Sequence, residues 1–198
     1  MKLILIRHGL TQDATKKIGQ SPSSRLSRKG ILQSKKVAKR LKNEKIDLIF
    51  SSDYKRAVQT ANEIAKFHKI KIIKKKDLRE FLIHDKQGKA YDEFDFDYDD
   101  LLESYFLKPN KKTPSGESFN IFKNKIIKFY NYLHKKYHPK TIVVVTHGHV
   151  IGLLLSHLLR KPRYFLKIEQ HNTGLNLIEV DEDKKHKIHL INDTAHLE

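Results

Sequence analysis

The chain has 198 residues and no cysteine, and its 40 Lys and Arg exceed its 23 Asp and Glu by a formal net charge of +17. With 38% apolar and 32% charged residues, it is typical of globular proteins and unlike disordered chains. The lack of cysteine excludes disulfides and thiolate metal sites and fits a cytoplasmic protein. No apolar run reaches the length needed to cross a bilayer, so we expect no membrane partner.

The length falls within the size range of one domain, and no internal repeat or low-complexity linker divides the chain. We therefore expect a single domain over residues 1–198. A strongly positive charge can mark proteins that bind nucleic acid, but here scattered lysines supply most of it. Because no basic motif with interleaved aromatic residues accompanies them, nucleic acid is not the favoured partner.

The first predicted element is a strand over Leu3–Ile6, a short apolar run that stops at Arg7, His8 and Gly9. Runs of this kind suit strands buried on both faces of a parallel sheet. The charged residues then fall at the carboxyl end of the strand, where open α/β sheets form their ligand crevice. Arginine is scarce in this chain, which makes Arg7 more informative than any lysine.

A polar loop is expected over residues 12–25, because it holds glycine, proline and several serines. Apolar residues then recur at helical spacing and predict a helix from about residue 28 to 43, with Ser27 as its N-cap. This segment supplies a layer to cover the sheet.

Residues 47–52 predict a second strand, and Asp53 is placed to cap the helix that follows. Arg56 falls in the first turn of that helix, close to the end of the strand. Arg7 lies at the same kind of strand-to-helix junction. We therefore expect both arginines to belong to one pocket.

The pattern changes after an extended segment over residues 70–80. Between Tyr91 and Asp100, acidic residues alternate with aromatic ones, and prolines close the stretch. Alternation can indicate a strand, but aspartate disfavours strands. We expect a helical or irregular excursion over about residues 81–114, near the mouth of the pocket.

A long helix is expected to open at Ser115–Ser118, with Glu117 in its first turn, and to end at His138-Pro139. The strand that follows, over residues 141–146, leads into His147. A second histidine thus follows a buried strand and precedes a glycine that lets the backbone approach a ligand. We expect His147 to share a pocket with His8.

The remaining elements are an apolar helix over residues 150–159 and two closing strands, over 175–180 and 186–191, that look antiparallel at a sheet edge. The order of elements predicts an α/β fold, a three-layer sandwich around a mostly parallel central sheet.

Two histidines and two arginines at strand ends could form one of three kinds of site: a metal site, a serine hydrolase site or a phosphoryl-transfer site. A metal site would place arginines where they repel the cation. A serine hydrolase would need a Gly-x-Ser-x-Gly elbow, and the chain has none. A phosphoryl group suits the set, because guanidinium groups bind its oxygens, one imidazole attacks phosphorus and the other stabilises the developing charge. Glu80 is the leading candidate for the acid that protonates the leaving group.

A family resemblance supports this chemistry. The stretch Leu5-Ile-Arg-His-Gly-Leu-Thr11 resembles the Arg-His-Gly signature of the histidine phosphatase superfamily, in its phosphoglycerate mutase-like branch. Further similar motifs follow in the family's order: Leu26 to Gln33, Ser51 to Ala61, Leu78-Arg-Glu80, Ser115 to Ser118 and Val145 to Gly148.

The resemblance implies that His8 is the nucleophile and becomes phosphohistidine, and that Glu80 is the proton donor. It implies a phosphate pocket of Arg7, Arg56 and His147, to which Gly148 is added, with no metal or other cofactor. Family members often have Glu after Arg-His-Gly and then Trp-Asn, which this chain lacks, so Thr11 and Gln20 become substitute phosphate ligands. The usual Gly-x-Trp-x-Gly stretch after the acid is also absent. Three other histidines could add pocket polarity or be incidental: His84, His149 and His171.

In the family that the chain resembles, mutases generally carry longer insertions, so the resemblance favours a phosphatase acting on a small phosphomonoester, a phosphoric monoester hydrolase. The alternatives are mutase-type phosphoryl transfer, a protein phosphohistidine phosphatase, and a non-catalytic module that binds a phospholigand or nucleic acid. The expected partner is a small phosphorylated substrate, and the sequence leaves a homodimer open.

Overall fold

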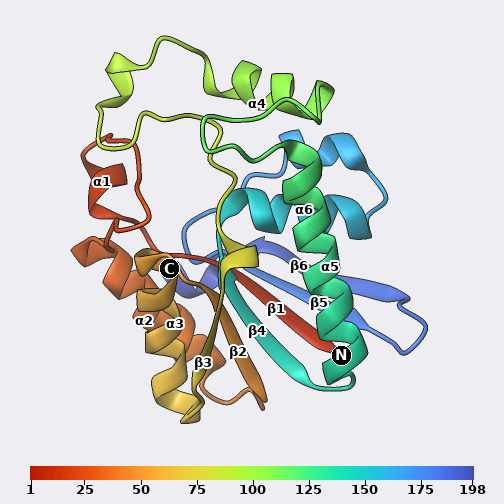
Figure 1. The fold of residues 1–198 in the computed structure, drawn as a ribbon. Helices are drawn as coiled ribbons and strands as arrows, with labels where there is room; N and C mark the ends of the chain where they lie inside the picture. The colour runs from red at the N-terminus through yellow and green to blue at the C-terminus, as the bar shows by residue number, and fades with distance from the viewer.

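A six-stranded sheet with the order β3-β2-β4-β1-β5-β6 forms the centre of the computed structural model, which describes residues 1–198 (Figure 1). Its strands are β1 (Lys2–Arg7), β2 (Leu48–Ser52), β3 (Ile72–Lys75), β4 (Thr141–Thr146), β5 (Leu175–Val180) and β6 (His186–Asp193). The first four are parallel to one another, whereas β5 is antiparallel to both of its neighbours. The mostly parallel sheet and its antiparallel edge are therefore confirmed.

The register of the two central strands brings the predicted histidines together. In the parallel pair β1–β4, Arg7 lies opposite Thr146. The residues that directly follow these two strands are His8 and His147. They therefore leave the sheet at the same edge and at the same level. This is the carboxyl edge of the parallel strands, where α/β folds place their ligands.

Helices cover both faces of the sheet. The helices α2 (Arg28–Leu41) and α3 (Lys55–His68) pack on one face, and α5 (Phe119–Tyr137) and α6 (Gly148–Leu158) pack on the other (Figure 1). Along β1, Ile4 and Ile6 belong to the core between the sheet and the helices α2 and α3. Leu3 and Leu5 belong to the core between the sheet and the helices α5 and α6. Because successive side chains of a strand point to opposite faces, an uninterrupted apolar run is what a strand between two helix layers requires. The three-layer architecture is confirmed.

The helix starts differ in part from the expectation. Ser27 caps α2 as predicted, accepting a hydrogen bond of 3.0 Å from the Gly30 N–H. Asp53 does not cap α3, because its carboxylate pairs with Arg79 and the N-cap position is held by Tyr54. The long helix α5 has Ser118 as its N-cap, so Glu117 precedes the first turn.

Two other segments contain more structure than the sequence indicated. The polar loop expected over residues 12–25 begins with a short helix, α1 (Gln12–Thr15). The extended segment expected over residues 70–80 is shorter, because β3 gives way to a 3₁₀ turn at Lys76–Leu78.

The excursion predicted over residues 81–114 lies above the carboxyl edge of the sheet (Figure 1). It holds a 3₁₀ turn at Tyr91–Glu93 and the helix α4 (Tyr98–Leu107). Asp97 caps α4 by accepting hydrogen bonds from the N–H groups of Asp99 and Asp100, at 2.8 and 3.0 Å. The aspartates that disfavour a strand here therefore start a helix instead.

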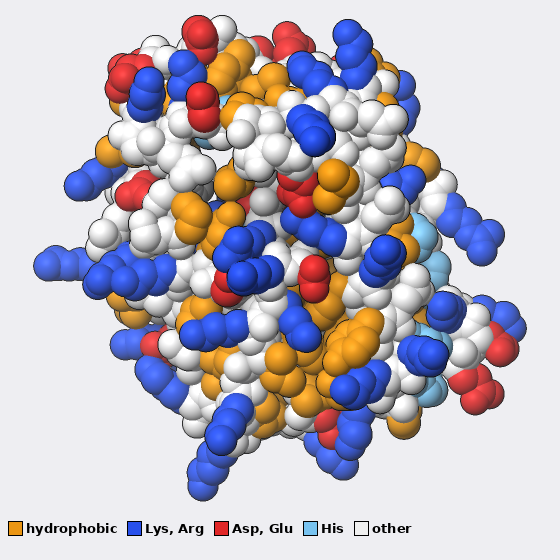
Figure 2. Space-filling model, in the orientation of Figure 1, with side chains coloured by type: hydrophobic (Ala, Val, Ile, Leu, Met, Phe, Trp, Pro, Cys, Tyr) orange, Lys and Arg blue, Asp and Glu red, His pale blue; other side chains and the backbone are white.

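Lysine and arginine side chains are spread over the whole face seen in Figure 2, with acidic side chains between them. This distribution agrees with a solvated surface. None of the helices combines the length and the apolar character that crossing a bilayer requires. Two further 3₁₀ turns, Pro162–Leu166 and Ala195–Leu197, complete the fold.

Candidate active site

A cleft of about 810 Å³ opens at the carboxyl edge of the sheet, beneath the excursion. Most of the predicted site residues line it: Arg7, His8, Gln20, Arg56, Glu80 and Gly148. Two do not reach its surface, because His147 and Thr11 are both 0% exposed. His147 lies directly behind His8, with 5.2 Å between the ring centroids.

The imidazole of His8 is oriented by one hydrogen bond on each side. Its Nδ1 lies 2.8 Å from the Gly9 carbonyl oxygen, an acceptor, so Nδ1 carries the proton. The other nitrogen, Nε2, is then unprotonated and accepts a hydrogen bond of 3.0 Å from Arg56 Nε. Burial lowers the pKa of His8 well below its ordinary value, and the charges of Arg56 and Arg7 lower it further. His8 is therefore neutral near pH 7 and presents a lone pair at Nε2.

His147 is held from two sides as well. Its Nε2 lies 2.9 Å from Ser52 Oγ, and the ring of Tyr54 meets it edge-on at 5.3 Å between centroids. Nδ1 is buried and has no protein partner. Burial lowers the pKa of His147 well below its usual range, with Arg56 and His8 adding to the effect. Both imidazoles are thus neutral, which makes them a nucleophile and a hydrogen-bond donor rather than two cations.

The two arginines supply the positive charge. Arg56 is 3% exposed, donates from Nη1 to the Ser21 carbonyl at 2.7 Å, and lies 5.1 Å from the ring centroid of Tyr54. Burial lowers the pKa of Arg56 to about 10, so the group stays a cation near pH 7. Arg7 donates from Nη1 to the carbonyl of Gln170, whereas its Nε is buried without a partner. This buried donor beside the cleft is free to bind an anionic group that enters it.

Glu80 faces the same cleft. Its Oε1 accepts a hydrogen bond of 3.0 Å from the Phe81 N–H and lies 3.3 Å from Nδ1 of His149. Burial raises the pKa of Glu80, but His149, the Phe81 N–H and Arg56 together outweigh it, so the net pKa lies below its ordinary value. Gly148 leaves open the space between Glu80 and Arg7, since a Cβ there would lie 4.0 Å from Glu80 Oε2 and 3.8 Å from Arg7 Nε.

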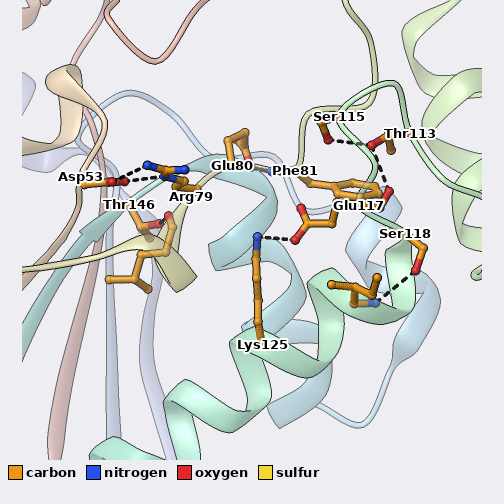
Figure 3. A network of polar contacts seen from close by, with 12 residues as sticks. Asp53, Arg79, Glu80, Phe81, Thr113, Ser115, Glu117, Ser118, Lys125 and Thr146 are labelled. Atoms are coloured by element: carbon orange, nitrogen blue, oxygen red, sulfur yellow. Dashed lines mark hydrogen bonds and ion pairs between the residues drawn. The ribbon is translucent and has the colours of Figure 1, made fainter.

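The neighbours of Glu80 fix its backbone in place (Figure 3). Arg79 forms a two-bond ion pair with Asp53, with distances of 2.8 and 2.6 Å. Thr146 Oγ1 donates to the Leu78 carbonyl at 2.7 Å, which ties the same segment to β4. Phe81 is buried and stacks on Phe122 at 4.8 Å between centroids. Glu80 therefore sits between two anchored residues and points away from the core.

Thr11 and Gln20 act as a pair. The hydroxyl of Thr11 caps α1 by accepting from the Ala14 N–H, and it donates to Gln20 Oε1, both at 3.1 Å. Because Thr11 is buried and engaged on both sides, it positions Gln20 instead of facing the cleft. Gln20 reaches the cleft with its amide NH₂ group free of protein hydrogen bonds.

Two buried residues behind the cleft lining were not assigned from the sequence. Ser52 and Tyr54 hold His147, and a serine pair at a strand end carries no sequence signal of that role. Of the three additional histidines, His84 and His149 line the cleft, whereas His171 lies outside it. No group of three or more His, Asp or Glu side chains in residues 1–198 is arranged to hold a metal ion.

We expect the buried histidines to make stability depend on pH. The unfolded chain protonates histidine below about pH 6.5, whereas His8 and His147 resist protonation in the fold. The free energy of unfolding should therefore fall with decreasing pH from there, by up to about 1.4 kcal/mol per pH unit for each histidine. Urea unfolding between about pH 7 and 5 measures this slope. The double variant His8→Asn, His147→Asn should show a smaller slope, and an unchanged slope would contradict the assignment.

The comparisons with known proteins agree with this geometry. The family model described as the histidine phosphatase superfamily (branch 1) matches residues 3–194. Phosphoglycerate mutase-like protein 4 of Arabidopsis thaliana is 33% identical, with the alignment covering 100% of this chain and 87% of the relative. The metal-independent phosphoserine phosphatase of the same plant is 30% identical, covering 99% and 83%. The solved structure of an Entamoeba histolytica phosphoserine phosphatase mutant in complex with phosphoserine is similar with a TM-score of 0.80 and 29% identity, covering 99% and 98%.

Proposed function

Because the chain belongs to branch 1 of the histidine phosphatase superfamily, we propose that it hydrolyses small phosphomonoesters through a phosphohistidine at His8, without a metal. One observation carries the proposal: Nε2 of a buried, neutral His8 lies unprotonated at the cleft beside the guanidinium group of Arg56. The names of the relatives, two of which are phosphoserine phosphatases, support a phosphoric monoester hydrolase.

In the first step the phosphoryl oxygens take hydrogen bonds from Arg7, Arg56 and the free amide of Gln20. This replaces the bond between Arg56 Nε and His8 Nε2 and frees the lone pair. Nε2 then forms a bond to phosphorus as the ester P–O bond breaks. His147 is buried directly behind His8, and entry of the phosphoryl group beside His8 would bring its oxygens to the unpartnered Nδ1 of His147, which then stabilises the growing charge.

The leaving alkoxide needs a proton, and Glu80 is placed to give it. In the free protein the pKa of Glu80 is below its ordinary value, which favours the carboxylate. A bound phosphate dianion opposes a second negative charge beside it and so favours the protonated acid. After the alcohol departs, Glu80 accepts a proton from water, whose oxygen attacks phosphorus and releases neutral His8 and inorganic phosphate.

All of these groups come from one chain, so the proposed reaction does not require a homodimer. In this proposal residues 1–198 form one histidine phosphatase domain. A cytoplasmic location is part of the proposal, on the ground that the chain has no cysteine.

The proposal is tested with the purified chain and a panel of phosphomonoesters, with and without EDTA. We expect repeated turnover that releases inorganic phosphate at the same rate in both conditions. Loss of activity in EDTA and its return with Mg²⁺ would contradict the metal-independent reaction. Phosphorus NMR of 3-phosphoglycerate in the same experiment detects mutase activity, because the 2-phosphoglycerate isomer would then appear in place of phosphate.

A further inference from the structure

The cleft is much larger than a phosphoryl group needs. Its inner end holds His8 and the side chains proposed to bind phosphate, and the rest of its volume of about 810 Å³ lies under the excursion. Five ring side chains from residues 81–114 line that outer part: His84, Tyr91, Phe94, Phe96 and Tyr98. Beside them lie the aliphatic side chains of Leu82, Ile83, Leu102, Leu166 and Ile168. A leaving group attached to a phosphate at His8 would occupy this space.

The rings form a continuous array. Phe94 stacks on Phe96 with 5.3 Å between centroids and 27° between planes, and His84 lies 5.0 Å from Phe94. On the other side, Tyr98 stacks on His149 at 6.0 Å and 9°. The array therefore extends from the mouth of the cleft to the histidine that contacts Glu80.

These rings are not ordinary core residues. Within the same segment Phe81 is 1% exposed and Tyr105 is 4% exposed, and both belong to the core that contains α5 and α6. Phe94 and Phe96 are instead half-buried, and Tyr91 and Tyr98 are 43% and 41% exposed, while all four line the cleft. Keeping large rings in contact with water costs free energy that burial under a ligand would recover.

The charges of the outer cleft do not suit a small charged leaving group. Apart from Arg7 and Arg56, Lys167 is the sole Lys or Arg that lines the cleft, and Glu169 and Asp99 lie on the same lining. A leaving group with a carboxylate would thus meet one cation and two acids. Neutral hydrogen-bonding groups are present instead, since His84 Nδ1 accepts from the Lys86 N–H at 3.1 Å and keeps its other ring nitrogen free.

We propose that the outer cleft is a stacking subsite, and that the substrate is a phosphomonoester of an alcohol that carries a flat aromatic or heteroaromatic ring. This inference rests on the proposed phosphatase function and goes further, because it names the leaving group. The ring would lie against Phe94, Phe96 and Tyr98, with its polar atoms toward His84. Stacking of this kind favours an aromatic ester over an alkyl ester by about two- to tenfold per ring contact.

The test compares two esters of primary alcohols whose leaving groups are equally poor, 2-phenylethyl phosphate and n-propyl phosphate, together with phosphoserine. The kcat/KM should be at least about tenfold higher for 2-phenylethyl phosphate than for the other two. In Phe94→Leu and Phe96→Leu, the ratio of the phenylethyl to the propyl ester should fall severalfold toward one, because leucine keeps the apolar volume and removes the ring. Phe67→Leu, at an exposed phenylalanine of α3, is the matched control and should keep the wild-type ratio.

The outcomes separate the two proposals. If all three esters are hydrolysed and the kcat/KM for phosphoserine equals or exceeds that for 2-phenylethyl phosphate, the stacking subsite is overturned. The phosphatase function then still holds. A ratio that does not change in either leucine variant also overturns it. If none of the three esters is hydrolysed, both the stacking subsite and the phosphatase function are overturned.

Discussion

Replacing His8 by alanine is expected to lower kcat by at least about 10³-fold, because it removes the nitrogen that forms the covalent bond to phosphorus. No other group can take this place without rearrangement. His147 is the nearest imidazole, but it is 0% exposed and its Nε2 is engaged with Ser52. Steady-state release of inorganic phosphate from one small phosphomonoester measures the effect.

The matched control is His189→Ala. His189 lies on the edge strand β6, where it pairs with Glu179 at 3.0 Å, and it does not line the cleft. This variant should keep the wild-type rate, which separates loss of the nucleophile from a general effect of removing an imidazole. A His8→Ala protein that is folded and retains a tenth or more of the wild-type kcat would contradict the nucleophile assignment.

Replacing Glu80 by glutamine is expected to slow the hydrolysis of alkyl phosphates by about 10²- to 10⁴-fold, the contribution typical of a general acid. Glutamine keeps the shape of the side chain and an oxygen that can accept from the Phe81 N–H, but it has no proton of the required acidity. p-Nitrophenyl phosphate should be slowed by less than about tenfold, because its phenolate leaves without being protonated. The ratio of the two kcat values is the measurement.

Glu117→Gln controls for the loss of an acidic group. Glu117 lies outside the cleft and pairs with Lys125 at 2.6 Å (Figure 3). Its replacement should leave the hydrolysis of both classes of ester unchanged. If Glu80→Gln slowed alkyl and aryl esters by the same factor, Glu80 would be a positioning or charge-balancing residue and not the proton donor.

The strands and their function-bearing ends could be predicted from the sequence. An apolar run such as Leu3–Ile6 suits a strand between two helix layers, and the end of that strand fixes where Arg7 and His8 emerge. The same holds for β4 and His147. Local pattern and tertiary structure agree at these positions, and most of the site follows from them.

Details that depend on contacts between distant segments could not be predicted. Aspartate is a common N-cap residue, but the carboxylate of Asp53 accepts two charged hydrogen bonds from the guanidinium group of Arg79, which is distant in sequence. It therefore pairs with Arg79 instead of capping α3. Thr11 stands next to the signature motif, but its hydroxyl is needed to start α1 and to hold Gln20. The spacing of residues along the chain predicts neither the pairing of Asp53 with Arg79 nor that of Thr11 with Gln20.

The excursion shows the same limit in another way. Its aspartates and aromatic residues predicted an irregular or helical segment near the pocket; the structure has a 3₁₀ turn and α4 in this segment, with several of its rings on the cleft lining. The alternation does not tell which rings are buried in the core, as Phe81 is, and which face the cleft, as Phe94 and Phe96 do. That division depends on how the excursion packs against distant segments, as α4 does against the turn at Pro162–Leu166, and it is the basis of the proposed substrate class.

The central claim is the covalent intermediate, and the most direct measurement is to trap it. The chain is mixed with excess phosphomonoester, quenched in alkali, which preserves phosphohistidine, and mapped by mass spectrometry and phosphorus NMR. We predict a single phosphoryl group on Nε2 of His8, absent from His8→Ala and labile to acid. A phosphoryl group on any other residue, or turnover with no phosphoenzyme detected at any time, would contradict the account.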